Sequence, residues 1–204
     1  MSRYRGPRVK LMRALGLNLP GLSRKSIERR PYPPGAHGGD RRRKESDYGR
    51  QLKEKQKLRF NYGLGERQLR RLVVDARRSK METGKKLLEL LESRLDNVVF
   101  RAGLASTIPG ARQLVNHAHV LVNGQKVDIP SFRVKVGDVI TVRERSKKIQ
   151  AIKDALESPS LQKPDWLSVN PAEMKAVVDR SPDESSVPFP IEVQLVVEYY
   201  ARMI

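Results

Sequence analysis

The sequence predicts an α+β protein: a basic N-terminal arm, a small helical bundle, and an α/β domain whose helices pack on a small, mainly antiparallel sheet. Three observations predict this class. Proline and glycine interrupt residues 1–45 too often for long helices. Apolar residues recur at helical spacing from about residue 51 to residue 102. Asn123-Gly124, a strong hairpin signal, stands between two short apolar runs.

The charge of the chain indicates a polyanionic partner. The 204 residues include 41 Lys+Arg and 23 Asp+Glu, a net charge of +18. The surplus is +9 in residues 1–48, +7 in 49–93 and +4 in 94–145, whereas 146–204 carries −2. Such an excess concerns binding partners and not the fold. We therefore expect the first half of the chain to carry most of the capacity to bind a polyanion.

Other compositional features exclude several classes of function. The chain has no cysteine and only three histidines, so we expect neither a metal nor a cofactor. No apolar run approaches the roughly 20 residues that cross a bilayer, and the N-terminus lacks the apolar core of a signal peptide. We therefore expect no membrane partner. Phosphate-binding glycine loops and nucleophile motifs are absent, so we expect no enzyme and no small-molecule substrate.

The predicted N-terminal extension covers residues 1–45. Leu11, Leu15 and Leu19 allow one or two short helical turns. A basic segment broken by proline and glycine buries little apolar surface on its own, so we expect it to order mainly against a partner.

The predicted helical domain covers residues 46–93. Ser46 and Asp47 are N-cap candidates for a basic helix over 51–61. A second helix over 66–79 has one apolar stripe, formed by Leu69, Leu72, Val73 and Ala76. A third helix begins near Thr83, and its apolar face continues without a break to Ala102, before Gly103.

The predicted α/β domain covers residues 94–190. A helix begins at Thr107, two short strands flank Asn123-Gly124, and further strand residues follow. These further residues are Val134, Val136 and 139–142, with a turn at Gly137-Asp138. The spacing predicts a helix over 146–156, a strand over 166–169 and a loop over 180–190. Residues 191–201 fit both a helix and a strand; the spacing of Ile191, Leu195 and Tyr199 favours a helix, and 191–204 is expected to join the helical domain.

Residues 94–145 closely resemble the α-L RNA-binding domain. The resemblance depends on Arg94-Leu95-Asp96, Ala111-Arg112-Gln113-Leu114-Val115, His117, Val122-Asn123-Gly124 and Gly137-Asp138. Outside this module, "RYRGPRVKLMR" (3–13), "PPGAHG" (33–38), "SDYGRQLKEKQKLRFNYG" (46–63) and "VVEYYAR" (196–202) resemble the small-subunit ribosomal protein S-four family, of bacterial or plastid type.

The sequence departs from the family pattern in two places. Ile108-Pro109-Gly110 replaces the usual acidic or polar start of the second α-L helix, so Thr107 lacks a capping-box partner at Gly110, and this helix is expected to start loosely or at a shifted position. Some relatives bind zinc through cysteines in the arm, a property that this cysteine-free chain does not share.

The resemblance implies a primary binder of small-subunit rRNA that nucleates assembly of the 5′ domain and contributes to decoding accuracy. Folded RNA junctions are recognised through shape, phosphates and 2′-hydroxyls, which suits dispersed cations on a preformed surface. The candidate RNA-binding residues come from the arm, the helical domain and the α-L module. They are Arg3, Tyr4, Arg5, Arg8, Lys10, Arg13, Arg50, Lys53, Lys55, Lys57, Arg59, Arg70, Arg71, Arg77, Arg78, Lys85, Arg94, Arg112, Gln113, His117, Asn123 and Gly124.

The resemblance also implies contacts beyond rRNA. Arg41 and Lys44 match positions that line the channel through which messenger RNA (mRNA) enters the ribosome. Ribosomal proteins of the S-five and S-three types are the expected neighbours, and the acidic residues Glu184, Glu192 and Glu198 are candidate contacts. The expected location is the ribosome of the cytoplasm, or of the plastid stroma if the source is an organelle. The alternative is a free-standing, ribosome-associated RNA-binding or stress protein that uses the same module.

Overall fold

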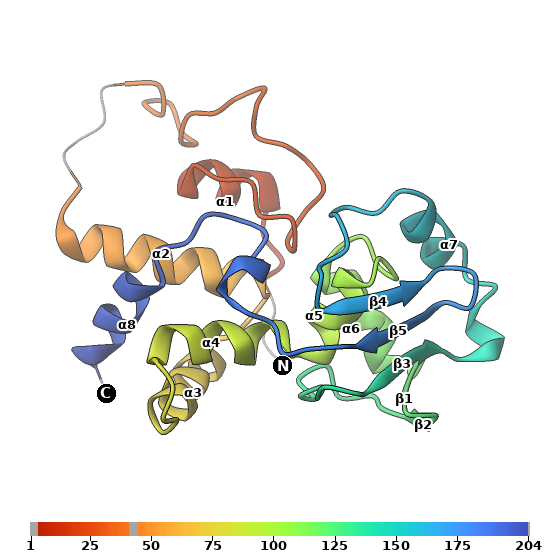
Figure 1. Cartoon of the computed structure of the whole chain (residues 1–204). Helices are drawn as coiled ribbons and strands as arrows, with labels where there is room; N and C mark the ends of the chain where they lie inside the picture. Colours follow the sequence, from red (N-terminus) through yellow and green to blue (C-terminus); the bar gives the residue numbers. More distant parts are fainter. Residues whose placement is uncertain (1–3, 41–44, 204) are drawn as a thin grey trace. The chain divides into compact units, whose positions relative to one another are not determined.

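The computed structural model describes residues 4–40 and 45–203. The chain divides into two compact units, one formed by Met1–Leu87 with Phe189–Ile204 and the other by Leu88–Pro188. The first division falls inside a helix, so the two units share one continuous element (Figure 1). Each unit has its own aliphatic core, and together they confirm the α+β class.

The first unit is helical. Its elements are α1 (Arg8–Leu15), α2 (Asp47–Asn61), α3 (Glu66–Arg77), the first half of α4 (Thr83–Glu92) and α8 (Val193–Ala201). In Figure 1, α8 lies against α2 although the two are far apart in the sequence. The Ser46 hydroxyl accepts a hydrogen bond from the Gly49 N–H at 3.2 Å, which confirms Ser46 as the N-cap of α2. The helix predicted over 191–201 is also confirmed.

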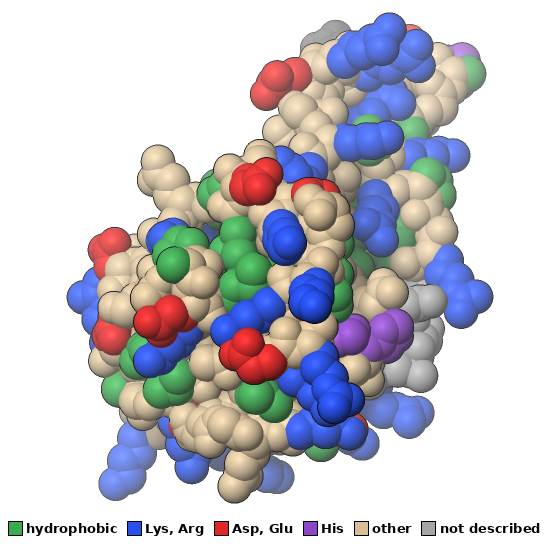
Figure 2. Space-filling view, turned by 90° about the vertical axis from the view of Figure 1, so that its right-hand side faces the viewer, with side chains coloured by type: hydrophobic (Ala, Val, Ile, Leu, Met, Phe, Trp, Pro, Cys, Tyr) green, Lys and Arg blue, Asp and Glu red, His purple; other side chains and the backbone are tan. Residues whose placement is uncertain are grey.

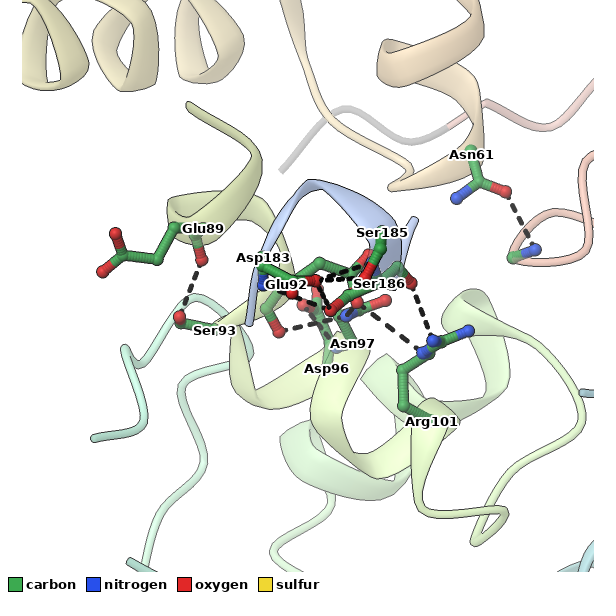
Figure 3. Close-up of polar contacts among 11 residues, drawn as sticks. Asn61, Glu89, Glu92, Ser93, Asp96, Asn97, Arg101, Asp183, Ser185 and Ser186 are labelled. Atoms are coloured by element: carbon green, nitrogen blue, oxygen red, sulfur yellow. Dashed lines mark hydrogen bonds and ion pairs between the residues drawn. The ribbon is translucent and has the colours of Figure 1, made fainter. Parts of the chain in front are cut away.

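The N-terminal segment buries more apolar surface than its composition predicts. Met12, Leu19, Leu22 and Ile27 are all buried in the first unit. The Gly21 N–H donates to Asn61 Oδ1 at 2.9 Å, which attaches the segment to the end of α2 (Figure 3). The expectation that this segment buries little by itself is therefore wrong for residues 4–40. Isolated leucines between prolines carry no periodic signal, so the sequence pattern did not show their burial.

The second unit contains a five-stranded antiparallel sheet with the order β2-β1-β3-β5-β4. Its strands are β1 (Val120–Val122), β2 (Gln125–Lys126), β3 (Val139–Val142), β4 (Leu167–Asn170) and β5 (Lys175–Val178). Its helices are α5 (Leu95–Arg101), α6 (Ile108–Asn116) and α7 (Gln150–Glu157), with short 3₁₀ turns η1 (Glu144–Ser146) and η2 (Glu184–Ser186). α5 and α6 pack together, and these helices bury Leu95, Val99, Ile108, Ala111 and Val115.

The hairpin at Asn123-Gly124 is confirmed. Asn123 has φ 50° and Gly124 has φ 79°, the positive values that a type I′ turn requires at both central positions. Leu121 pairs with Lys126, and Val122 pairs with Gln125. The start of α6 is regular: Thr107 is the N-cap, and its hydroxyl accepts from the Gly110 N–H at 3.3 Å. The expected loosening of this helix start is therefore wrong.

The helix expected to run unbroken from Thr83 to Ala102 is wrong, because the chain leaves the helical conformation at Ser93-Arg94. Arg94 is extended, with ψ 137°, and pairs with Arg133 in an isolated β-bridge. The Leu95 N–H donates to the Phe132 carbonyl at 2.9 Å, and the Val134 N–H donates to the Ser93 carbonyl at 2.9 Å. These long-range bonds replace helical ones, although the apolar periodicity continues across the break.

Two further details differ from the sequence prediction. Strand β5 was not predicted, and residues 134–136 form no strand within the described chain. Val134 N–H is already bound to Ser93, so this stretch attaches to the start of α5 and not to the sheet.

No helix among residues 4–40 and 45–203 is long and apolar enough to cross a membrane. The same residues contain no group of three or more histidine and carboxylate side chains that could hold a metal ion.

Candidate nucleic-acid interface

A buried carboxylate holds two of the predicted RNA-binding arginines. Asp96 is fully buried, and the Arg94 side chain is 6% exposed. Arg94 donates from Nε to Asp96 Oδ1 at 3.1 Å and from Nη2 to Oδ2 at 2.8 Å. Arg112 donates to Oδ2 from Nε at 3.0 Å and from Nη2 at 2.6 Å. One negative charge therefore serves two guanidinium groups inside the fold.

This cluster positions the two helices of the RNA-binding module. Arg94 is the N-cap of α5, Asp96 lies in the first turn of α5, and Arg112 comes from α6. The Asn97 N–H also donates to Asp96 Oδ1, at 3.0 Å. Because its guanidinium is buried and donates two hydrogen bonds to Asp96, Arg94 serves the architecture of the module. Arg112 is more accessible, with 13% of its side chain exposed.

A second buried network fixes the end of α4 and the far side of α5 (Figure 3). Asn97 Nδ2 donates to the Glu92 carboxylate at 2.9 Å and to the Glu92 carbonyl at 3.0 Å. Arg101 donates from Nη2 to the Ser186 carbonyl at 2.7 Å, and its Nε lies 3.6 Å from Glu92 Oε2. The η2 turn is capped by Asp183, whose Oδ1 accepts from the N–H and hydroxyl of Ser186. These contacts join the end of α4 to α5 and α5 to the η2 turn.

The remaining predicted residues of the module lie at its surface. Gln113 and His117 are exposed at the C-terminal half of α6, and Asn123 and Gly124 are exposed at the hairpin tip. Asn123 is held in place, because its Nδ2 donates to Asp138 Oδ1 at 2.8 Å and its Oδ1 accepts from the Val139 N–H at 2.8 Å. The hairpin tip is thus a preorganised edge.

Two histidines lie next to each other at the end of α6 and the start of β1. The rings of His117 and His119 are 5.9 Å apart, and His119 Nδ1 lies 2.9 Å from Ser146 Oγ. Burial, followed by the charges of His117 and Arg143, lowers the pKa of His119 below its ordinary value. His119 is therefore neutral at pH 7, and its place in the fold is structural.

Sequence reasoning missed several exposed cations of the second unit. Arg143, Arg145 and Lys148 follow strand β3 directly, and Arg133 and Lys135 lie in the segment before it; all five are exposed. In the view of Figure 2, lysine and arginine side chains lie next to histidines, and acidic side chains are fewer and separate from one another. The run "RERSKK" at 143–148 is a signal that could have identified three of them.

In the first unit, the cations of α2 fall into two groups. Lys55 is 4% exposed, donates to Glu66 Oε2 at 2.9 Å and lies over the Tyr199 ring. Lys57 pairs with Glu54, and Arg59 lies 3.8 Å from Glu66 and over the Phe60 ring. These three groups are largely engaged inside the unit. Arg50, paired with Asp47, and Lys53, 3.8 Å from Glu45, are more accessible.

The cations of α3 and its end are more open. Arg71 and Arg78 are exposed, and neither side chain has a hydrogen bond or ion pair with the described residues. Arg70 is exposed and donates to the Met203 carbonyl at 3.3 Å, whereas Arg77 is half-buried. On α4, exposed Lys85 lies 2.9 Å from Glu82.

The predicted residues of the arm also differ in role. Arg13 donates to the carbonyls of Arg30 and Tyr32, each at 3.0 Å, and so holds the loop that follows. Arg8 donates to the Leu22 carbonyl at 3.2 Å. The exposed residues Arg5 and Lys10 make no such contact within the described chain, and Tyr4 packs edge-on against Phe60 at 5.3 Å. Arg3, Arg41 and Lys44 lie outside the described residues.

The described surface therefore offers many open guanidinium and ammonium groups on rigid elements, together with a second set of cations that the fold uses internally. A guanidinium fork binds phosphate oxygens in pairs. Cations held on preformed helices and strands suit recognition of a folded polyanion by shape.

Comparisons with known proteins agree with this arrangement. Residues 3–92 match the family model of the ribosomal protein S4/S9 N-terminal domain, and residues 93–140 match that of the S4 domain. The small ribosomal subunit protein uS4 of Methylobacillus flagellatus is 59% identical over 203 residues, covering 99% of both chains. The proteins of the same name from Picosynechococcus and Geobacillus kaustophilus are 53% and 50% identical, over 100% and 99% of this chain and the whole of each relative. These matches confirm the resemblance drawn from the residues, and the chain belongs to the small-subunit ribosomal protein S4 family.

Proposed function

We propose that this chain is a structural, non-enzymatic component of the small ribosomal subunit that binds rRNA directly and nucleates assembly of its 5′ domain. The observation that carries the proposal is the set of open cations on preformed elements. Arg71 on α3, Arg78 at the end of α3, and Arg143 and Arg145 after β3 represent this set. The relatives named small ribosomal subunit protein uS4 supply the assembly in which such a surface would act.

The proposed contacts with RNA are mainly electrostatic. Each cation that meets a phosphate releases condensed counterions, so affinity falls steeply as the salt concentration rises. The chain has few aromatic side chains, 5% in all, which argues against stacking of single-stranded bases as the main mode. We propose that Arg71, Arg78, Gln113, His117 and the hairpin tip contact RNA, and that Arg94 and Lys55 support these contacts indirectly.

Chemical footprinting of small-subunit rRNA, with and without the purified chain, tests the proposal. We expect protection clustered at one multi-helix junction of the 5′ domain in moderate potassium chloride. The double variant Arg71→Gln with Arg78→Gln should weaken the protection, whereas Glu173→Gln, an exposed change in the second unit, should leave it unchanged. Equal binding to rRNA and to a scrambled transcript at the same salt concentration would contradict the proposal.

The resemblance further supports a role for Arg41 and Lys44 at the mRNA channel. The variant Arg41→Ala with Lys44→Ala should slow translation through a stable mRNA hairpin and leave subunit assembly normal. Unchanged speed through the hairpin would remove this part of the proposal.

Contacts with S-five-type and S-three-type proteins, and a contribution to decoding accuracy, are also proposed. Glu184 and Glu192 are exposed, whereas Glu198 accepts a hydrogen bond from Gln51 at 3.0 Å within the first unit. Glu184 and Glu192 are therefore the better candidates for a basic neighbour. Cell fractionation separates this role from that of a free-standing stress protein, because a structural component stays with the small subunit in near one-to-one amount through salt washes.

A further inference from the structure

The second unit contains a cavity of about 120 Å³ between the segment that enters β4 and the loop that follows β5. Its lining includes Arg101, Asp165, Trp166, Arg180 and Asp183. None of these residues is among the RNA-binding candidates. The cavity lies in the part of the chain where the charge changes from strongly positive to slightly negative.

Two buried donors that line this cavity have no acceptor. Trp166 is 2% exposed, and its Nε1–H makes no hydrogen bond with the described residues. Arg101 is 7% exposed, and its Nε is likewise without a hydrogen bond, since Glu92 Oε2 is 3.6 Å away. Buried polar groups are nearly always paired in native structures. An indole N–H can only donate, so the missing partner is an acceptor oxygen.

The charges around the cavity argue against a phosphate as that acceptor. Arg101 and Arg180 are matched by Asp165 and Asp183 in the lining, and buried Glu92 adds a further negative charge behind Arg101. Arg180 already lies 3.4 Å from Asp165. The field at this site is therefore balanced or slightly negative, in contrast to the rest of a chain with a net charge of +18. A neutral carbonyl oxygen meets the donors without an electrostatic penalty.

Two exposed carboxylates in the lining, those of Asp165 and Asp183, can accept hydrogen bonds from a partner. The Asp165 side chain is 89% exposed. Asp183 is exposed, and its Oδ1 accepts the hydrogen bonds of the η2 cap from Ser185 and Ser186. Its Oδ2 has no hydrogen-bond partner in the described chain. Hydrogen bonds from Ser185 and Ser186 lower the pKa of Asp183, so its carboxylate is charged at neutral pH. The same cap fixes the loop in place (Figure 3).

We propose that this cavity is a docking site for a basic peptide segment of a partner protein. A main-chain carbonyl of the peptide accepts from Trp166 Nε1–H and Arg101 Nε–H, and a lysine or arginine of the same segment pairs with Asp165 and Asp183. This assignment is independent of the proposed rRNA contacts, which use other residues.

The single tryptophan of the chain makes the test direct. In a ¹H–¹⁵N spectrum of the full chain, one indole signal reports Trp166 Nε1–H. The probe is the blocked pentapeptide Ac-Gly-Arg-Gly-Lys-Gly-NH₂. We expect a saturable downfield shift of the indole proton, because a hydrogen bond to an acceptor forms. The overall positive charge of the protein repels this peptide, so saturable binding reflects local recognition.

Two comparisons identify the determinants. Replacing both basic residues of the peptide by glutamine should weaken binding about 5-fold, and Asp165→Asn should weaken it about 3-fold, which is the range for exposed ion pairs. Glu173→Gln, an exposed acidic change in the same unit, should leave the affinity unchanged. The variant Trp166→Phe confirms the assignment by removing the reporter signal.

Three results would overturn the proposal. Inorganic phosphate or an RNA oligonucleotide that moves the indole signal and competes with the peptide would identify an anion site. If the peptide binds Asp165→Asn and the wild type with equal affinity, the carboxylate of Asp165 takes no part in binding. An indole signal that no probe moves would assign the cavity to water alone. The proposed rRNA contacts use other residues and are tested by the footprint, so the two proposals fail separately.

Discussion

The carboxylate of Asp96 is the group whose loss should have the largest effect on the second unit. The substitution Asp96→Ala removes the acceptor of four guanidinium N–H bonds and of the Asn97 N–H. Arg94, with 6% of its side chain exposed, then has a buried charge without a counter-ion. Arg112 is 13% exposed and can turn part of its guanidinium toward solvent.

The magnitude follows from these burials. Removing one partner of a buried ion pair costs about 3–5 kcal/mol, because the other charge stays desolvated. A domain of about 100 residues has a total stability of about 5–15 kcal/mol. The variant should therefore lose at least a fifth of its stability, and its melting temperature should fall by at least about 12 °C. Arg112→Leu keeps the pair between Arg94 and Asp96, so it should cost less than about 2 kcal/mol.

Urea unfolding followed by tryptophan fluorescence is the assay, because Trp166 lies in the second unit and is the single tryptophan of the chain. Asp128→Asn is the matched control: its carboxylate is 56% exposed and lies 3.9 Å from Lys126, so the change should cost less than about 0.5 kcal/mol. A cooperative transition in Asp96→Ala with a loss below about 1 kcal/mol would refute the claim that Asp96 holds the module together.

Other predictions concern binding, pH and local conformation. Arg71→Gln with Arg78→Gln should reduce the slope of log binding constant against log salt concentration for rRNA by about 2, with the melting temperature unchanged. An unchanged slope in filter-binding measurements would contradict this prediction. Burial lowers the pKa of His119, so the folded second unit binds fewer protons than the unfolded chain. The urea midpoint of this unit should therefore fall as the pH drops from 7 toward 5, and His119→Asn should reduce that fall. Burial alone would raise the pKa of Glu66, but hydrogen bonds from Tyr200 and Lys55 outweigh it and lower the pKa. The first unit should therefore lose stability as the pH falls below the ordinary carboxyl pKa of 4.5, and Glu66→Gln should cost about 1–3 kcal/mol by circular dichroism. Gly124→Ala places a side chain at φ 79° and should cost about 1–2 kcal/mol in urea unfolding, although the added methyl group meets open space.

Local patterns were enough to predict most of the elements. Asn123-Gly124 predicts its own turn, because positive φ at two successive positions is a local demand. The helices α2, α3 and α8 follow from stripes or caps within a dozen residues. Each of these signals depends on neighbours in the sequence, so each could be predicted before the structure was known.

The failures share a different cause. The break at Ser93-Arg94 depends on bonds to the carbonyl and N–H groups of residues 130–134, about 40 residues away, while the apolar spacing runs through it unchanged. Strand β5 is defined by its pairing with β3 and β4, and no local sequence signal identified it. Long-range hydrogen bonds override local preference in both places.

The candidate RNA-binding residues fall into an inward-facing group and an open group for the same reason. A sequence identifies every lysine and arginine, but it does not show which of them has a carboxylate close by in the fold. Lys55 meets Glu66 eleven residues on, and Arg112 meets Asp96 sixteen residues back, so two predicted RNA ligands turn inward. Arg71 and Arg78 look no different in the sequence and remain open.

This division gives the surplus of positive charge two separate tasks. A cation paired with a buried carboxylate adds less to the field outside the protein than an open cation does, and it fixes the helices on which open cations stand. Removing an inward cation should therefore lower stability first and reduce RNA binding only as a consequence, whereas removing an open one should reduce binding at constant stability. The proportion of the two effects, measured residue by residue, distinguishes a shaped RNA-binding surface from a diffuse positive charge.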